Sequence, residues 1–318
     1  MGTVQPMPHD ANHRLTPGTI ALLIIPPLMW AGNAVVGRMV QGLVPPITLN
    51  FMRWLLAFAL LLPVAGWVLR PGSGMWPHWR RFATLGLLGV GLYNALQYMA
   101  LKTSTPINVT LVAAATPIWM LLLGRLFFGV SISRQAALGA VLSLAGVATV
   151  LSRGELGHLL QVKLVAGDAW MLLATLAWAT YSWLLARPKP GAEPAAIKAD
   201  WAAFLMAQMA LGLVWSGAMT AGEWAWMVHQ GNAASQITWG WPLIAALVFV
   251  AIGPSLLAYR CWGAGVGRVG PTIAGFFSNL TPLFAAMMSA TLLGEMPQAY
   301  HALGFALIVS GIVVSSRR

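Results

Sequence analysis

PTIAGFFSNLTPLFAAMMSATLLG, residues 271–294, repeats an earlier part of the chain. A shift of 165 positions places this segment, without a gap, on PINVTLVAAATPIWMLLLGRLFFG, residues 106–129. Both segments begin with proline, end with glycine and carry a Thr-Pro pair at the same internal place. A looser shift of 148 positions pairs Trp30-Ala31 with Trp178-Ala179. These matches indicate that the chain consists of two related halves.

The composition excludes a soluble protein. Of the 318 residues, 58% are hydrophobic and 8% are charged, whereas soluble domains carry about 25% charged residues. Such a chain spans the lipid bilayer many times, so its net charge of +11 reflects basic loops rather than a nucleic-acid partner. The lone Cys261 excludes an intramolecular disulfide and a thiolate metal cluster, and nothing in the sequence predicts a metal or another cofactor.

Apolar runs separated by polar residues, prolines and glycines predict an all-α integral membrane protein with ten transmembrane helices. Because each half then crosses the membrane an odd number of times, the second half enters upside down, which predicts two inverted-topology five-helix repeats. The expected parts are an N-terminal tail (1–18), a first repeat (19–151), a linker (152–167), a second repeat (168–315) and a C-terminus (316–318). The predicted helices cover residues 19–40, 47–69, 82–101, 105–128, 135–151, 168–187, 201–220, 239–262, 270–293 and 298–315.

Basic residues predict the orientation in the membrane. With the N-terminus inside, 13 of the 18 Lys and Arg residues fall in inside segments, 4 fall in outside segments, and Arg53 lies within a span. The positive-inside rule therefore predicts that both termini are cytoplasmic. The expected location is a bacterial inner membrane, as a multi-pass protein.

Short motifs spread along the chain carry a resemblance to a known family. They are Trp30-Ala31-Gly32-Asn33, Arg53-Trp54, Gly167-Asp168 with Trp178 and Tyr181, and most specifically Asn279-Leu280-Thr281-Pro282 followed by Leu293-Gly294-Glu295. With these motifs the chain resembles the drug/metabolite transporter superfamily, and within it the ten-helix EamA-type permeases, over about residues 19–315. In the first half, Phe128-Gly129-Val130 stands where such permeases commonly have Leu-Gly-Glu. The resemblance implies export of amino acids or other small metabolites.

Trp30 and Trp178 lie near the middle of their predicted helices, although membrane tryptophans usually gather at the interfaces. We predict that they form an aromatic wall of a central cavity that stacks on the substrate, with plain helix packing as the alternative. Polar residues within spans are costly unless they meet partners or a wet cavity. The other candidate substrate-binding residues are Asn33, Asn94, Gln97, Tyr98, Tyr181, Tyr259 and Asn279, with Thr116, Ser278 and Thr281 beside them, and hydrogen bonding between helices is their alternative role.

Pro117 and Pro282 occupy equivalent places in the fourth and ninth predicted helices, where each removes a backbone donor. We predict a hinge at both prolines, and a tolerated kink is the alternative. Arg53 is a candidate anion contact for a substrate carboxylate. A side chain that reaches outward to the interface, or that holds a neighbouring carbonyl, is the alternative.

Acidic residues and histidines fall in predicted loops or at helix ends rather than in mid-span. Proton relays usually need such groups at depth, so the sequence favours a facilitator or a form of coupling that it does not reveal. Asp168 and Glu295 are the exceptions by position, and Asp168 is expected to cap the sixth predicted helix, where a carboxylate suits the N-terminal dipole.

The leading prediction is a secondary transporter that exports small metabolites, such as amino acids or related amphipathic compounds, by alternating access through a central cavity. An exporter of toxic lipophilic compounds is the alternative within this class. An integral membrane enzyme would need a cluster of catalytic or metal-binding residues, and the dispersed acidic residues and histidines predict no catalytic residue. Small residues in the fifth and tenth predicted helices serve packing within a monomer or a homodimer seam.

Overall fold

The computed structural model describes residues 15–104, 106–155, 157, 165–231, 237–293 and 298–317. Within these ranges the regular secondary structure is helical, apart from one isolated bridge between Gln41 and Val44. Eight helical segments of the described residues are long and apolar enough to cross a membrane. The predicted all-α fold is therefore confirmed for the described residues, and the eight apolar segments fit a multi-pass membrane protein. The residues 1–14 and Glu295 lie outside the described residues.

The helices of the first half follow the predicted apolar runs. The side chain of Thr16 caps the first helix and that of Ser133 caps the last, as expected of hydroxyl residues at helix starts. A π-helical turn, η3, joins two helices into one continuous run. The elements are α1 (Pro17–Met39), α2 (Pro46–Ala65) with the 3-10 turn Gly66–Leu69, a second 3-10 turn (Trp76–His78), α3 (Trp79–Leu85), η3 (Gly86–Leu92), α4 (Tyr93–Thr103), α5 (Pro106–Ala113), α6 (Thr116–Phe127) and α7 (Arg134–Leu151).

The second half is also helical. A second π-helical turn, η4, again lies inside a long run. The elements are α9 (Ala166–Ala186), α10 (Ala195–Ala199), α11 (Trp201–His229), α12 (Trp241–Val250), η4 (Ala251–Leu257), α13 (Ala258–Ser278), α14 (Leu280–Leu293) and α15 (Ala299–Ser316).

Two helix ends differ from the prediction. α11 continues to His229, nine residues beyond the expected end at 220, because Glu223 accepts hydrogen bonds from the backbone N–H groups of Ile47 and Thr48 at the start of α2. This tertiary contact holds the last turns of α11 against a neighbour, whereas the sequence around them is typical of a loop.

Residues 263–269, expected to be a loop because they are rich in glycine, are helical in α13. Gly265 lies directly against Leu23 of α1, so glycine serves close helix packing there. The chain instead changes direction at Gly270, whose φ of 81° and ψ of 164° belong to a region that only glycine adopts readily.

Both Thr-Pro pairs lie at helix interruptions. α5 ends at Ala113 and α6 begins at Thr116, and α14 begins at Leu280, just before Thr281-Pro282. Proline cannot donate a backbone hydrogen bond, which favours an interruption one turn earlier. Pro26 and Pro27, by contrast, lie inside an unbroken α1. Whether Pro117 and Pro282 act as hinges stays a prediction.

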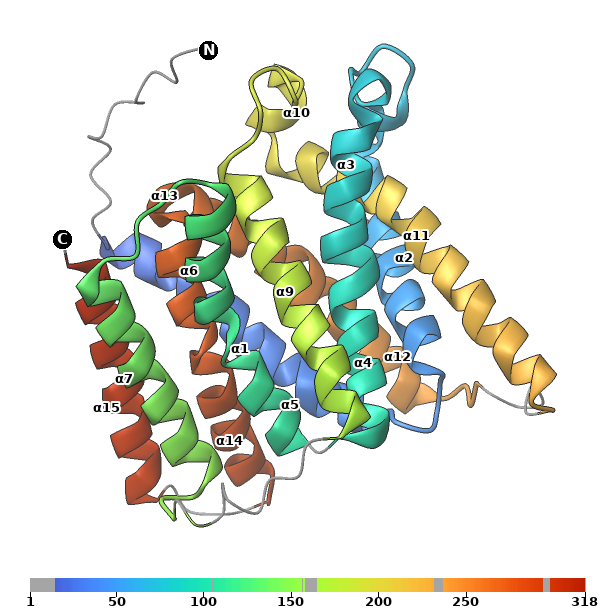
Figure 1. Cartoon of the computed structure of the whole chain (residues 1–318). Helices are drawn as coiled ribbons and strands as arrows, with labels where there is room; N and C mark the ends of the chain where they lie inside the picture. The colour runs from blue at the N-terminus through green and yellow to red at the C-terminus, as the bar shows by residue number, and fades with distance from the viewer. Residues whose placement is uncertain are drawn as a thin grey trace.

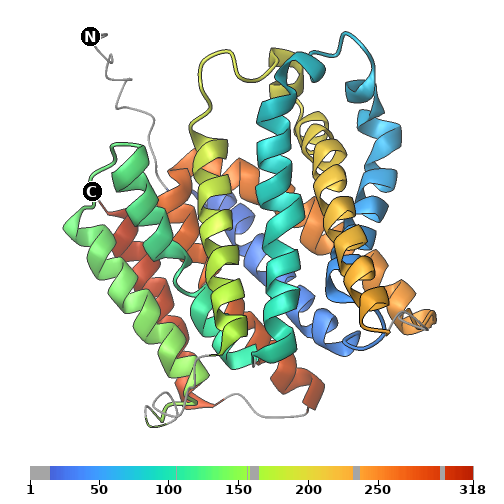
Figure 2. The same ribbon diagram turned by 45° about the vertical axis from the view of Figure 1, so that its right-hand side comes forward.

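The helices form a bundle with α7 and α15 at one edge and α2 and α11 at the other (Figures 1 and 2). α1 packs on α13 and α14 in the middle, and α9 packs on α4, α5 and α6. We call end A the end where α1 begins and α15 ends, at the top of Figure 1, and end B the opposite end. The short α10 projects at end A.

The packing of α7 against α15 is made by glycines. A Cβ atom on Gly139 would lie 2.7 Å from the carbonyl oxygen of Gly311, and one on Gly146 would lie 2.7 Å from that of Gly304. The two backbones thus touch where a side chain would not fit. These small residues therefore serve contacts within one chain.

Candidate functional site

A cavity of about 280 Å³, here called the central cavity, lies between helices of both halves. Its wall includes Trp30, Gln97 and Trp178, three of the predicted substrate-binding residues. Arg38, Met39 and Leu101, from the last turns of α1 and α4, extend it toward end B. The remaining lining residues are Ala34, Val35, Tyr93, Val109, Thr110, Ala113, Ala114, Thr116, Ser278, Thr281, Pro282 and Ala285.

Trp178 lies at the centre of a group of aromatic rings, and only 2% of it is exposed. Its ring is stacked on that of Tyr181 at 5.1 Å and meets Trp30 edge-on at 5.0 Å. The ring centroids of Tyr93, Tyr259 and Trp262 lie 5.1 to 5.4 Å from that of Trp178. Trp30 and Trp178, predicted to form one aromatic wall, are in direct ring contact, whereas substrate stacking stays a prediction.

Tyr181 and Tyr259 face a different space. They line a cavity of about 520 Å³ that reaches end A, here called the end-A cavity, together with Phe204 and Gln208. Since Trp178 lines the central cavity and contacts both tyrosines, one layer of rings separates the two cavities. We call Trp178, Tyr181 and Tyr259 the aromatic layer.

Arg53 is fully buried and is bonded to uncharged groups of the protein. Its Nε and Nη2 atoms donate to Ser255 Oγ at 3.0 and 2.8 Å, and its Nη1 donates to Asn33 Oδ1 and to the Tyr98 hydroxyl at 3.1 Å. The Tyr98 hydroxyl in turn donates to Asn33 Oδ1 at 2.8 Å. This Arg53 network joins α1, α2, α4 and η4. Asn33 and Tyr98 therefore act between helices here, which is the alternative that the sequence left open.

Asn94 and Asn279 lie away from the central cavity, whereas Thr116, Ser278 and Thr281 line it. Asn279 donates from Nδ2 to Ser143 Oγ of α7 at 2.8 Å, so it points toward the glycine-packed edge of the bundle. Asn94 is buried but is not part of the central cavity wall. Asp168 accepts from the backbone N–H of Val165 at 2.8 Å and from the hydroxyl of Ser104, which confirms the predicted cap.

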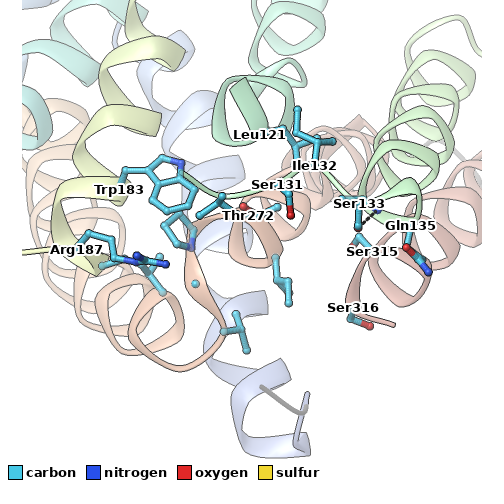
Figure 3. A pocket seen from close by; sticks show the side chains of 18 of the residues that line it. Leu121, Ser131, Ile132, Ser133, Gln135, Trp183, Arg187, Thr272, Ser315 and Ser316 are labelled. Carbon is cyan, nitrogen blue, oxygen red and sulfur yellow. Dashed lines mark hydrogen bonds between the residues drawn. The ribbon is translucent and has the colours of Figure 1, made fainter. Parts of the chain in front are cut away.

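A further cavity of about 540 Å³ at end A does not contain the predicted substrate-binding residues. Figure 3 shows Trp183 and Arg187 of α9 on one side of it and Ser315 and Ser316 of α15 on the other. The Trp183 indole nitrogen donates to the carbonyl of Met120, so this ring is held by the structure. The geometry favours the central cavity as the candidate site.

Sequence reasoning missed two rings of the site, Tyr93 and Trp262. Tyr93 lies one helical turn before Gln97 and so shares its face, a signal that was present in the sequence. Trp262 lies three residues after Tyr259 in a segment that resembled a helix end. Among the described residues no group of three or more His, Cys, Asp or Glu side chains could hold a metal ion.

Comparison with known proteins adds to this geometry. A profile of the EamA-like transporter family matches residues 18–152 and again residues 165–317. An uncharacterized transporter of Archaeoglobus fulgidus is 28% identical over 303 residues, which cover 94% of this chain and 98% of that protein. A probable amino-acid metabolite efflux pump of Salmonella typhimurium is 26% identical over 315 residues, which cover 94% of each chain.

An aromatic amino acid exporter of Ancylobacter novellus is 24% identical over 295 residues, which cover 91% of this chain and 93% of that protein. A solved crystal structure with 22% sequence identity has the same fold, with a TM-score of 0.67 over 94% of this chain and 97% of that chain.

Proposed function

The chain belongs to the EamA-like transporter family of the drug/metabolite transporter superfamily, and on this premise we propose that it exports amino acids or related amphipathic metabolites by alternating access. The observation that carries the proposal is the pair of cavities, one reaching each end of the bundle, that meet at the aromatic layer. Relatives named as an amino-acid metabolite efflux pump and as an aromatic amino acid exporter support this substrate class.

We further propose that the ten transmembrane helices form two inverted five-helix repeats, residues 19–151 and 168–315. The two separate family matches support this division. The contacts support it too, because α1 packs on α13 as α9 packs on α4, and the fifth helices of both halves, α7 and α15, pack on each other. The segment Trp241–Ser278 has 38 residues, well beyond the roughly 20 that one crossing needs. This length and the kink at Gly270 support a turn between two crossings at that residue.

The size and lining of the central cavity suit a small amphipathic molecule. Its volume of about 280 Å³ lies just below the range of roughly 300–1,000 Å³ that is typical of ligand pockets. Trp30 and Trp178 offer apolar ring surfaces, and Gln97, Thr116 and Ser278 offer hydrogen-bonding groups that orient the polar end. This volume favours metabolites of amino-acid size over larger toxic lipophilic compounds.

The charge distribution supports one orientation of the protein in the membrane. End A carries most of the basic residues, so by the positive-inside rule end A faces the cytoplasm. The membrane we propose is a bacterial inner membrane. Substrate then leaves through the central cavity, which extends toward end B. The halves move relative to each other at the interruptions before Pro117 and Pro282. Without an acidic residue in mid-span, transport is facilitated or is coupled through groups outside the cavity.

Counterflow in proteoliposomes tests this function. Vesicles loaded with unlabelled amino acids exchange labelled phenylalanine, and Trp178→Ala abolishes the exchange. Trp170→Ala, on the outward face of the same helix, where 40% of the side chain is exposed, is the matched control and keeps it. A rate of exchange that is the same with and without a pH gradient supports facilitated transport. If all amino acids are inactive while a lipophilic drug exchanges, the proposed substrate class is wrong.

A further inference from the structure

The end-A cavity combines an aromatic floor with a charged mouth. Tyr181, Tyr259 and Phe204 present rings at its inner end. The Tyr181 hydroxyl donates to Gln208 Oε1 at 2.9 Å, and the Tyr259 hydroxyl donates to the carbonyl of Gly89. Both phenol protons are therefore used by the protein, so the floor offers a ligand mainly ring surface.

The mouth of this cavity is cationic. Glu193 lies there, but its carboxylate is bonded to the Arg81 guanidinium at 2.7 Å, which balances its charge. Lys198 and Arg260 are exposed at the same mouth, and within the described ranges neither forms an ion pair. The Arg260 guanidinium carbon lies 4.7 Å from the ring centroid of Trp201, a contact that holds the cation in place.

We propose that the end-A cavity is an entry site that binds the substrate before it crosses the aromatic layer. The site takes an amphipathic carboxylate, with the carboxylate at Lys198 and Arg260 and the apolar side chain against Tyr181 and Tyr259. This inference rests on the proposed function and adds to it a second binding site with its own specificity. At about 520 Å³ the cavity has room for a molecule that also fits the central cavity.

The aromatic layer separates the entry site from the central cavity. The rings of Tyr181 and Trp178 are stacked, so a molecule against Tyr181 is one ring away from the central cavity. It reaches that cavity only when Trp178 moves. Substrate therefore stays bound at end A until Trp178 moves. Its carboxylate group is recognised there rather than in the central cavity, beside Trp30 and Trp178.

The test compares transport from the two ends of oriented vesicles with two probes, phenylalanine and phenylalaninamide, which lacks the carboxylate. The double variant Lys198→Gln/Arg260→Gln removes the cationic mouth. Exposed charge contacts are individually weak, so we expect the loss of both to have only a moderate effect. The ratio of the phenylalanine KM at end A to that at end B rises about tenfold, and the same ratio for the amide does not change. Arg80→Gln is the matched control, since Arg80 also lies beside a tryptophan ring, that of Trp79 at 5.7 Å, but does not line this cavity.

An unchanged ratio for phenylalanine, or an equal rise for the amide, overturns the entry site while the proposed function stands. Equilibrium binding of phenylalanine to the purified protein separates the two proposals further. If the protein binds phenylalanine but does not carry it, the proposed function fails, and weaker binding in the double variant still supports the site. If the wild-type protein does not bind phenylalanine, both proposals fail.

Discussion

The indole ring of Trp178 is stacked on the phenol ring of Tyr181, yet the two rings face different cavities. The Tyr181 hydroxyl is fixed by Gln208, whereas the indole N–H of Trp178 is buried without an acceptor among the described residues. Packing alone therefore holds the tryptophan, while hydrogen bonding holds its neighbour. We therefore predict that Trp178, rather than Tyr181, moves when substrate passes.

Truncating Trp178 opens the aromatic layer. In a Cys261→Ser background, a cysteine at Ser278 in the wall of the central cavity reports access from each end. We expect Trp178→Ala to raise its labelling from end A by a membrane-impermeant thiol reagent, and to destabilise the protein by about 3–5 kcal/mol. Trp170→Ala leaves the labelling unchanged. Equal labelling from end A with and without Trp178 contradicts a closed layer.

The prolines at the two interruptions affect rate more than affinity. Pro117→Ala or Pro282→Ala restores a backbone donor and favours a continuous helix, which stiffens the proposed hinge. We expect the maximal rate of counterflow to fall several-fold while KM stays within about twofold, as for a step that follows binding. Pro63→Ala is the control, because Pro63 lies inside the unbroken α2. A change in KM alone would assign these prolines to the binding site instead.

The contact between α7 and α15 does not tolerate a side chain. A methyl group at Gly311 would lie 2.7 Å from the carbonyl of Gly139, so Gly311→Ala forces the helices apart and costs about 1–3 kcal/mol. Gly222 of α11 has no neighbour within 4 Å, so Gly222→Ala stabilises by about 0.5–1 kcal/mol through its helix preference. Thermal melting in detergent measures both variants. Equal melting temperatures would show that the two backbones are not in contact.

Arg53 contributes to stability through its geometry as well as its charge. Lysine keeps the charge but does not reach Ser255, Asn33 and Tyr98 together, so Arg53→Lys costs about 2 kcal/mol, the value of one hydrogen bond to a charged group. The exposed Arg80→Lys stays within about 0.5 kcal/mol. Denaturant melting in detergent measures both. A stable Arg53→Lys protein with a raised KM for phenylalanine would instead assign Arg53 to the substrate carboxylate.

Sequence reasoning predicted what depends on local pattern. The long apolar runs located the helices. The shared place of Trp30 and Trp178 in the two halves predicted one aromatic wall, and their rings are in contact. The Thr-Pro pairs at Pro117 and Pro282 marked the two helix interruptions. The cap at Asp168 followed from the chemistry of a helix start.

The partners of polar groups depend on tertiary contacts that the sequence does not reveal. Asn33, Arg53 and Tyr98 lie within helices, as predicted, but each had several helices to face, and their mutual bonds depend on how those helices are rotated. Residues 263–269 were assigned to a loop because glycine breaks helices in water, whereas in a bundle it also allows Leu23 to approach Gly265. The extension of α11 depends on Glu223 meeting α2, far away in sequence.

The Arg53 network also bears on how the chain is assembled. A charged residue at the centre of a membrane helix raises the free energy of insertion by about 2.5–3.5 kcal/mol. When α2 is synthesised, Asn33 already exists in α1, Tyr98 follows soon after, and Ser255 is 202 residues away. α2 therefore enters the bilayer with an incompletely paired guanidinium. The hydrogen bonds of Arg53 are completed only when the second half packs against the first. Arg53 thus couples the insertion of α2 to the later packing of the second half. A chain truncated before Ser255 lacks one of the hydrogen-bond partners of this cation.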